Sequence, residues 1–208
     1  MQDIQAPNLM AAWSLETPED SVQLYSRWAE TYDREFAEAL SYELPKLVAR
    51  RFATLGGRGP VVDLGAGTGL VAEELNTKGI SPCDGVDISH EMLAMAEAKG
   101  CYRRVFQGNI LTRLPCETGV YDGCVSAGTF TLGHVGPEGL DEVVRILKTD
   151  GRACLSVHEK LYEERGFAQA LDRPDIQNLN LQSAPIYNVP SEDEHANYRA
   201  LLVSFTKV

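Results

Sequence analysis

No stretch of the sequence is apolar for long enough to cross a membrane, and residues 1–10 lack the basic and apolar regions of a secretion signal. We therefore expect a cytoplasmic protein with no membrane partner. Cysteines are also few, with five in 208 residues and no C-x-x-C pair among them. An odd, scattered set of this kind argues against a zinc site or a disulfide framework, so no metal is expected.

Basic residues are scarce as well, with 19 Lys and Arg against 30 Asp and Glu and a net charge of −11. A surface of this sign repels phosphate backbones, so nucleic acid is not expected as a partner. The paired arginines Arg50-Arg51 and Arg103-Arg104 are isolated, which favours solvated faces over a binding stripe. No repeat or linker divides residues 1–208, which suffice for a single α/β domain with its own core. Nothing in the sequence indicates an oligomeric state.

The most informative stretch is a short apolar segment, residues 61–64 (VVDL), followed by a glycine-rich turn, residues 65–69 (GAGTG). The first segment is typical of a strand that is buried on both faces of a parallel sheet. The glycines let the backbone turn tightly and leave room for a ligand against the main chain. Thr68 is predicted to cap a helix over residues 70–78. A strand, a glycine turn and a helix N-terminus together predict a site for a nucleotide-like ligand at the carboxyl edge of the sheet.

The spacing of the glycines distinguishes between two kinds of ligand. A dinucleotide-binding turn has the pattern G-x-G-x-x-G, but here Gly69 comes one residue early and Leu70 occupies the expected position. Asp63, just before the first glycine, would repel a pyrophosphate and attract a cation. A nicotinamide-dependent dehydrogenase is therefore disfavoured, although it stays an alternative.

With this acid and these glycines, the stretch resembles motif I of the class I S-adenosylmethionine (SAM) dependent methyltransferases. The resemblance covers roughly residues 25–208 and rests on several motifs in the right order. It implies an α/β, Rossmann-like fold with a seven-stranded, mostly parallel sheet, helices on both faces and an antiparallel last strand. The implied strand order is 3-2-1-4-5-7-6. The chain is similar overall to small methyltransferase-like proteins of the Williams–Beuren-region type.

The resemblance also implies SAM as the cofactor, and SAM carries a sulfonium and an ammonium but no phosphate. Asp63 is included among the predicted contacts, and the backbone of Gly65, Ala66 and Gly67 would host the methionine part. Asp87 follows the glycines by about twenty residues, where nucleotide-binding α/β folds place an acid that accepts hydrogen bonds from ribose hydroxyls.

The adenine ring is expected beyond the second and third strands. Ile88 and Met92 are predicted to sandwich it, although either could equally belong to the core. Residues 108–110 (Gly108, Asn109 and Ile110) stand where the family usually has Gly-Asp-Ile, and the side-chain carbonyl of Asn109 can accept the bond that the Asp would accept. Ala127, at the end of the predicted fourth strand, completes the cofactor contacts.

An aromatic segment precedes the glycine turn. Its pattern, Tyr25-x-x-Trp28-Ala-x-x-Tyr32-Asp, is similar to a segment that folds over the cofactor as a lid in many small-molecule methyltransferases. Tyr25, Trp28 and Tyr32 are therefore predicted cofactor contacts, and residues 1–55 form a predicted N-terminal helical lid or extension. The alternative is that these rings simply anchor the helix to the body of the protein.

Two histidines are expected at the carboxyl edge of the sheet, His134 in the loop over residues 128–134 and His158 at the end of the fifth strand. Either could take a proton from an acceptor near neutral pH, and His134 is the predicted catalytic residue. Methyl transfer often needs no such base, because the sulfonium is already activated and the protein mainly aligns the reactants.

The predicted function is therefore SAM-dependent methyl transfer to an unidentified acceptor, expected to be a small molecule. The chain has neither an Asn-Pro-Pro-Tyr motif nor a Pro-Cys pair, the signatures of enzymes that methylate DNA bases. A protein that binds SAM without transferring its methyl group, as a sensor or scaffold, stays an alternative.

Overall fold

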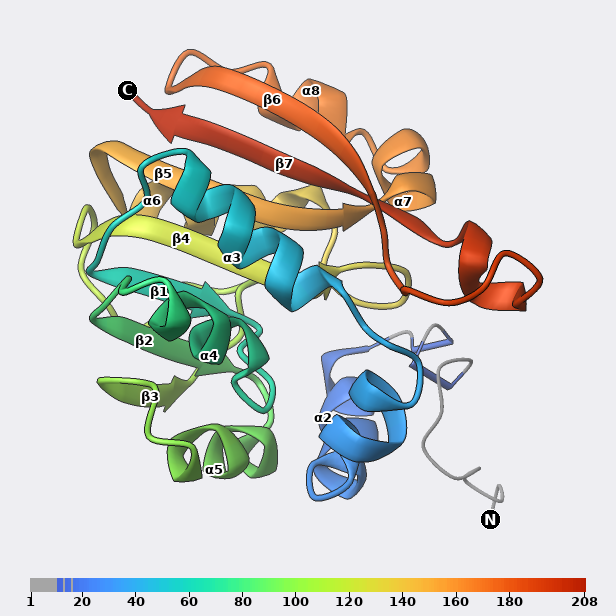
Figure 1. The fold of residues 1–208 in the computed structure, drawn as a ribbon. Coiled ribbons are helices and arrows are strands. Elements are labelled where there is room, and N and C mark those ends of the chain that lie inside the picture. Colours follow the sequence, from blue (N-terminus) through green and yellow to red (C-terminus); the bar gives the residue numbers. More distant parts are fainter. Residues whose placement is uncertain (1–10, 13, 16) are drawn as a thin grey trace.

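A seven-stranded sheet in the order β3-β2-β1-β4-β5-β7-β6 runs through the centre of the computed structural model (Figure 1). The strands β1 to β5 are parallel, whereas β7 pairs antiparallel with both β5 and β6. This topology confirms the predicted fold. The strands are β1 (Val61–Leu64), β2 (Cys83–Asp87), β3 (Arg104–Gln107), β4 (Tyr121–Phe130), β5 (Leu147–His158), β6 (Ile176–Pro185) and β7 (Arg199–Lys207).

The structure describes residues 11, 12, 14, 15 and 17–208. The part of the predicted lid that falls on residues 1–10, 13 and 16 lies outside the described residues. The described helices are α2 (Pro18–Trp28), the π-helix η1 (Asp33–Glu38), α3 (Leu44–Thr54), α4 (Leu70–Thr77), α5 (His90–Ala98), the 3₁₀-helix η2 (Pro137–Gly139), α6 (Leu140–Ile146), α7 (Glu159–Glu164), α8 (Phe167–Leu171) and the 3₁₀-helix η3 (Glu194–Asn197).

Helices cover both faces of the sheet. Helices α3 and α4 pack on one face through a cluster that includes Val61, whereas α6, α7 and α8 pack on the other through a cluster that includes Val62. Because successive residues of a strand point to opposite faces, β1 needs apolar side chains on both. Helix α2 and η1 lie beyond the carboxyl ends of the parallel strands (Figure 1).

Helix α2 begins as its sequence predicts. Thr17 caps it, and the reciprocal bond from the Thr17 backbone N–H to the side chain of Asp20 completes a capping box. The helix buries Leu24 and Trp28, whereas Val22 is only half-buried.

The predicted cap at Thr68 is wrong. Gly69, with φ of 95°, occupies the N-cap position of α4 and makes no side-chain bond. The hydroxyl of Thr68 donates instead to the carboxylate of Asp33 in η1. A tertiary partner has therefore replaced the local one, and the glycine turn is tied to the helical segment above it.

The helical segments after β4 are short. A 3₁₀ turn precedes α6, and Gly166, whose φ is 77°, separates α7 from α8. Strand β6 begins at Ile176 and most of its residues are exposed.

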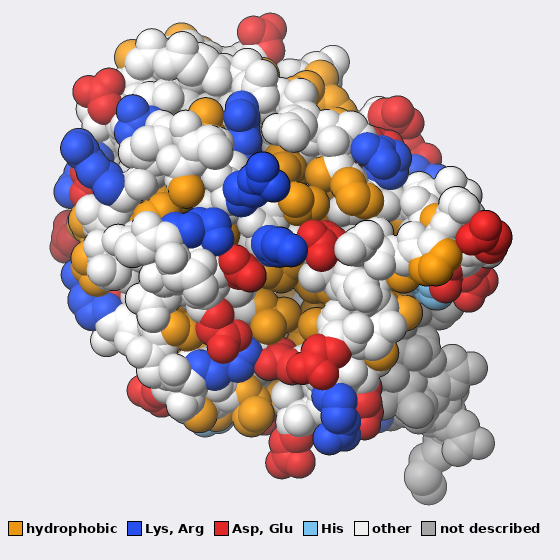
Figure 2. All heavy atoms as spheres, viewed as in Figure 1, with side chains coloured by type: hydrophobic (Ala, Val, Ile, Leu, Met, Phe, Trp, Pro, Cys, Tyr) orange, Lys and Arg blue, Asp and Glu red, His pale blue; other side chains and the backbone are white. Residues whose placement is uncertain are grey.

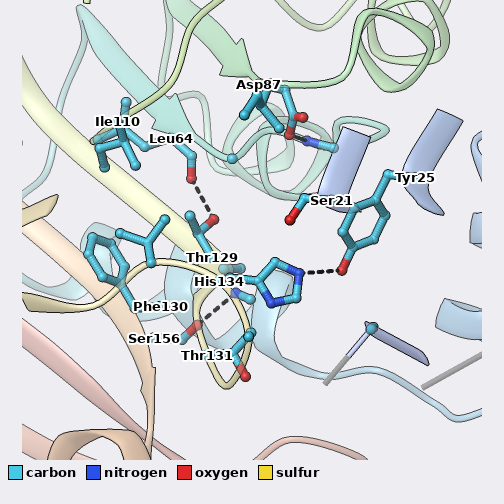
Figure 3. Close-up of a pocket in the computed structure, with 18 of the residues that line it drawn as sticks. Ser21, Tyr25, Leu64, Asp87, Ile110, Thr129, Phe130, Thr131, His134 and Ser156 are labelled. Atoms are coloured by element: carbon cyan, nitrogen blue, oxygen red, sulfur yellow. Dashed lines mark hydrogen bonds between the residues drawn. The ribbon is translucent and has the colours of Figure 1, made fainter. Parts of the chain in front are cut away.

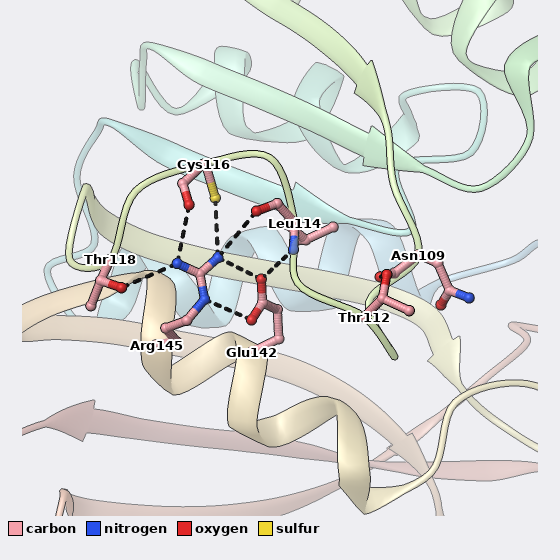
Figure 4. A network of polar contacts seen from close by, with 7 residues as sticks. All are labelled: Asn109, Thr112, Leu114, Cys116, Thr118, Glu142 and Arg145. Carbon is pink, nitrogen blue, oxygen red and sulfur yellow. Dashed lines mark hydrogen bonds and ion pairs between the residues drawn. The ribbon is translucent and has the colours of Figure 1, made fainter.

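An ion pair fixes the loop between β3 and β4 (Figure 4). Arg145 bonds Glu142 at 2.7 Å through Nε and also donates to the carbonyl oxygen of Cys116 at 3.0 Å. Glu142 accepts the backbone N–H of Leu114 at 2.6 Å. Since this loop starts at residues that border the cavity described below, the pair holds one wall of that cavity in place.

The paired arginines of β3 have a structural role. Arg103 and Arg104 both donate to Asp84, a fully buried carboxylate of β2, at distances of 2.7 to 2.9 Å. The two guanidinium groups thereby compensate the negative charge of the buried Asp84 carboxylate.

On the face that carries α3, Lys and Arg side chains are interspersed with Asp and Glu (Figure 2). Among the helices of the described residues, none combines the length and the hydrophobicity that a membrane crossing requires.

Candidate functional site

A cavity of about 360 Å³ lies at the carboxyl edge of the parallel strands. Its floor comes from the ends of β1, β2, β4 and β5, and its cover comes from α2 and η1 (Figure 3). Thirteen of the fifteen predicted site residues line it: Tyr25, Trp28, Tyr32, Gly65, Gly67, Asp87, Ile88, Met92, Gly108, Asn109, Ile110, Ala127 and His134. Asp63 and Ala66 do not.

The N–H groups of the glycine turn are bonded to acceptors of the chain itself. The backbone N–H groups of Gly65 and Ala66 both donate to the carbonyl oxygen of Val86, at 2.8 and 2.9 Å. The N–H of Gly67 donates to Asp87 at 2.8 Å, and that of Gly69 donates to the turn's own Ala66 carbonyl. These donors are therefore already engaged, whereas a pyrophosphate site needs them free to bind phosphate oxygens.

The two glycines at the centre of the turn have different surroundings. A Cβ at Gly67 would meet nothing within 4 Å, so this residue opens onto the cavity, and its φ of 53° suits glycine. A Cβ at Gly65 would collide with the hydroxyl of Thr129, which donates to the carbonyl oxygen of Leu64 at 3.0 Å. Gly65 is thus needed for the close approach of Thr129.

Asp87 lies at the end of β2 with its carboxylate beside the glycine turn. Its oxygens accept the backbone N–H groups of Gly67 and Ser89, each at 2.8 Å. Burial raises the pKa of Asp87, and these N–H groups oppose the rise. A carboxylate has about four acceptor positions, so two bonds leave capacity for a ligand's hydroxyl groups.

Asp63 lies beneath the turn and is fully buried. One of its oxygens accepts the hydroxyl of Tyr102 at 2.7 Å, and the other has no hydrogen-bond partner among the described residues. Burial raises the pKa of Asp63 to about 7, against the lowering effect of the Tyr102 bond, and the charge of Asp87 adds to the rise. Asp63 therefore acts on the cavity only through its field.

The residues predicted for the adenine end lie together at the ends of β2 and β3. Asn109 follows a glycine, Gly108, whose Cβ would collide with Leu114. The side-chain oxygen of Asn109 already accepts the backbone N–H of Leu111 at 2.9 Å. One lone pair of that oxygen is left for a ligand, which is less than the prediction assumed.

The three predicted lid aromatics do face the cavity, and they also pack on one another. The rings of Tyr25 and Trp28 are stacked with centroids 6.2 Å apart, and Trp28 meets Tyr32 edge-on at 5.2 Å. The same side chains therefore line the cavity and anchor the helix, which combines the two alternatives for this segment.

His134 lies in the loop after β4, opposite α2. Its Nδ1 is 2.9 Å from the carbonyl oxygen of Leu132, so Nδ1 carries the hydrogen. Nε2 is then a bare lone pair, and it accepts the hydroxyl of Tyr25 at 2.9 Å (Figure 3). Burial lowers the pKa of His134, which leaves a neutral imidazole at pH 7.

A second contact fastens the cover to the floor. The carboxylate of Asp33 accepts the hydroxyl of Thr68 and pairs with Lys99 at 2.7 Å. Since Thr68 belongs to the glycine turn, the position of η1 depends on the geometry of that turn.

Several lining residues were not predicted from the sequence. Tyr42 and Tyr187 come from segments without a motif, and an isolated antiparallel bridge between them brings them together. Ser156, on the same side of β5 as His158, accepts the N–H of Gly128 at 2.9 Å. The one sequence signal for Ser156 was its position two residues before His158 in a strand, because residues i and i+2 of a strand lie on the same face.

Taken together, these groups suit a cationic ligand that carries a ribose. The floor offers an acid at β2, open space over Gly67 and a buried acid beneath the turn. Nearby apolar side chains of Ile88 and Ile110 can pack against a flat ring. Because the N–H groups of residues 65–67 are engaged, a diphosphate would meet the negative charge of Asp87 with none of these three donors free to bind it.

Comparisons with known proteins agree with this geometry. The methyltransferase domain family matches residues 62–155, from β1 into β5. Human methyltransferase-like protein 27 is 32% identical over 161 residues, an alignment that covers 73% of this chain and 64% of that protein. The chain therefore matches a little under two thirds of this relative's length.

Solved structures share the fold. A TehB-like SAM-dependent methyltransferase from Corynebacterium glutamicum superposes with a TM-score of 0.62 at 22% identity, covering 92% of this chain and 100% of that one. A protein from Thermotoga maritima, described as a possible histamine N-methyltransferase, gives a TM-score of 0.62 at 19% identity, with 89% and 98% of the two chains covered. The matched domain, the related sequence and the shared topology together support a class I SAM-dependent methyltransferase, a family whose cofactor is SAM.

Proposed function

We propose that this protein transfers the methyl group of SAM to a small-molecule acceptor in the cavity beneath α2 and η1. The observation that carries the proposal is the glycine turn, in which the N–H groups of residues 65–67 are already bonded within the chain while acids lie beside and beneath it. Such a turn favours a positively charged ligand over a phosphate. When bound, SAM supplies an electrophilic methyl group on a sulfonium.

The predicted contacts give each part of the cofactor a place. The open side of Gly67 takes the methionine part, and Asp87 takes the ribose hydroxyls through its remaining acceptor positions. Ile88, Ile110 and Asn109 take the adenine ring at the ends of β2 and β3. Asp63 contributes through its charge rather than by contact, since it does not line the cavity.

In this arrangement, the chain's own residues mainly align the reactants and exclude water. Helix α2 covers the cavity through Tyr25 and Trp28, and the loop over residues 128–134 forms the opposite wall. His134 is the proposed base, because Nε2 is its bare nitrogen and faces the cavity cover. For it to receive a proton from an acceptor, the hydroxyl of Tyr25 has to move aside or pass the proton on.

A small acceptor fits the covered position of the cavity. The hydrogen bond between Tyr25 and His134 bridges α2 and the wall opposite, which narrows the approach of a folded macromolecule there. The five cysteines are free thiols, which supports the cytoplasmic location expected from the sequence.

The test is incubation of the full chain with SAM labelled on its methyl group and a cell extract, followed by separation of small molecules from macromolecules. We expect label in a small-molecule fraction, and loss of that label when the chain is heat-inactivated beforehand. Label confined to protein or nucleic acid would contradict the small-molecule acceptor. Binding of SAM with no label transferred to any fraction would favour the sensor or scaffold alternative.

A further inference from the structure

The cavity contains a cluster of tyrosine hydroxyls, two of which, on Tyr42 and Tyr187, belong to residues outside the cofactor contacts above. Tyr42 and Tyr187 line the part of the cavity nearest β4, β5 and β7. The side chain of Tyr42 reaches the end of β4, since a Cβ at Gly128 would come within 2.5 Å of its hydroxyl. Tyr187 is 3% exposed, yet it still borders the cavity.

The hydroxyls of Tyr32, Tyr42 and Tyr187 form no hydrogen bond with the described residues, and all three residues line the cavity. The three hydroxyls lie close enough to interact. Burial raises the pKa of Tyr32, and the neighbouring Tyr42 and Tyr187 add to that rise. Burial likewise raises the pKa of Tyr42 and Tyr187, so all three are neutral phenols. Hydroxyls that line a cavity without a partner can donate to, or accept from, a ligand there.

The charges around this cluster exclude one class of ligand. Among the described residues that line the cavity, Arg165 is the one with a cationic side chain, and it is exposed. Residues 1–16 contain no Lys or Arg in their sequence. An acceptor carrying a carboxylate or phosphate would lose its hydration without gaining a buried counter-charge, which is costly.

A cation meets the opposite environment. Ring faces attract ammonium groups, and Phe36, Tyr42 and Tyr187 form a contiguous set with centroids 5.2 to 6.1 Å apart. Phenol oxygens accept N–H bonds, and Asp87 adds a negative field from the cofactor side.

Resting on the proposed function, we infer that the methyl acceptor is an organic amine, held by the aromatic wall of Phe36, Tyr42 and Tyr187. The ammonium form that the aromatic wall attracts first loses its proton to water, and the nitrogen lone pair of the resulting free amine forms the new N–CH₃ bond. The S–CH₃ bond breaks and its electron pair returns to sulfur, so S-adenosylhomocysteine leaves. The positive charge moves from sulfur to nitrogen, and a product that still carries an N–H then releases one proton to water.

The base chemistry of the site agrees with this class. A neutral amine needs no general base in order to attack, whereas an alcohol must lose a proton as it reacts. Burial lowers the pKa of both His134 and His158, so each is a weak base in the cavity.

The first experiment measures binding without reaction. The full chain is saturated with S-adenosylhomocysteine and titrated with tetramethylammonium, and with acetate in a separate titration. We expect tetramethylammonium to bind and acetate not to bind. Tyr187→Leu, which removes the ring, should weaken that binding about 3- to 30-fold, and Tyr187→Phe, which keeps the ring, by less. Tyr162→Phe, in α7, is the matched control and should leave it unchanged.

The second experiment measures turnover on one hydrocarbon. Butylamine, butyrate, 1-butanol and 1-butanethiol are each incubated with the chain and SAM, and S-adenosylhomocysteine and the methylated product are quantified. We expect the amine to be methylated in preference to the other three.

Methylation of the acid, alcohol or thiol ahead of the amine would overturn the proposal, as would the absence of tetramethylammonium binding in a chain that binds SAM. A chain that does not bind SAM at all would contradict the proposed function itself, together with this inference. Unchanged SAM affinity in Tyr187→Leu distinguishes a weakened acceptor wall from a damaged cofactor site.

Discussion

The hydroxyl of Tyr25 donates a hydrogen bond of 2.9 Å to Nε2 of His134, so the cover of the cavity is fastened directly to the proposed base. The two residues lie in α2 and in the loop after β4, on opposite sides of the cavity (Figure 3). Because Nδ1 of His134 is committed to the Leu132 carbonyl, Nε2 is the nitrogen left for either Tyr25 or an acceptor. Access to the base and opening of the cover are therefore linked.

Tyr25→Phe removes this bond and keeps the ring. We expect a loss of about 0.5–1.5 kcal/mol in the free energy of unfolding, the usual range for one hydrogen bond, and faster amide exchange in α2. Chemical denaturation and hydrogen exchange measure the two effects. Tyr162→Phe is the control, and identical exchange of α2 in Tyr25→Phe and the unmodified chain would show that the bond does not hold the cover.

Gly67→Ala tests the open side of the glycine turn. The added methyl group projects into the cavity, so we expect SAM affinity to fall by about tenfold or more. The positive φ adds a stability cost of about 1–2 kcal/mol. Gly79→Ala shares the positive φ, at 68° against 53°, and also has open space around the new Cβ, but it lies outside the cavity. Equal SAM affinity in the two variants would contradict the assignment.

Asp87→Ala tests the ribose contact. Removal of a hydrogen-bonding carboxylate should cost about 1.5–3 kcal/mol of SAM affinity, or roughly 10- to 150-fold. Asp172→Ala, at an exposed position, is the control for lost charge. Calorimetry gives the affinities directly, and a loss smaller than twofold would remove Asp87 from the site.

Asp63 gives the chain a pH-dependent stability. Its pKa of about 7 in the folded chain is above the ordinary value of 3.8, so the folded state holds the proton more tightly than the unfolded state. The contribution of this group is therefore present below pH 4 and is lost as the pH rises towards 7. Asp63→Asn cannot titrate, so its stability relative to the unmodified chain should increase from pH 4 to pH 8.

Urea denaturation at several pH values measures this difference, with Asp172→Asn as the control for removing an exposed carboxylate. A constant offset between Asp63→Asn and the unmodified chain across the range would show that Asp63 is ionised in the fold throughout.

The sequence predicts the framework of the site because its signals are local. Gly67 and Asp87 lie in short motifs at strand ends, and parallel strands bring such ends to one edge. The strand order followed from the resemblance of those motifs to a known family, and the structure has the same order.

The remaining parts depend on long-range contacts, which local patterns do not encode. Tyr42 and Tyr187 meet through one bridge between segments that carry no motif. Thr68 satisfies the rule for a helix cap, but Asp33 competes for its hydroxyl. Asp63 was expected at the ligand, whereas the covering turn and Tyr102 confine it below.

The central claim is that the glycine turn accepts a sulfonium nucleoside and rejects a dinucleotide. Calorimetric titration of the full chain with SAM, S-adenosylhomocysteine and NADH under one set of conditions tests it most directly. The account predicts saturable binding of the first two at a single site and no saturable heat with NADH. Tight NADH binding, together with no heat from either sulfur compound, would contradict it.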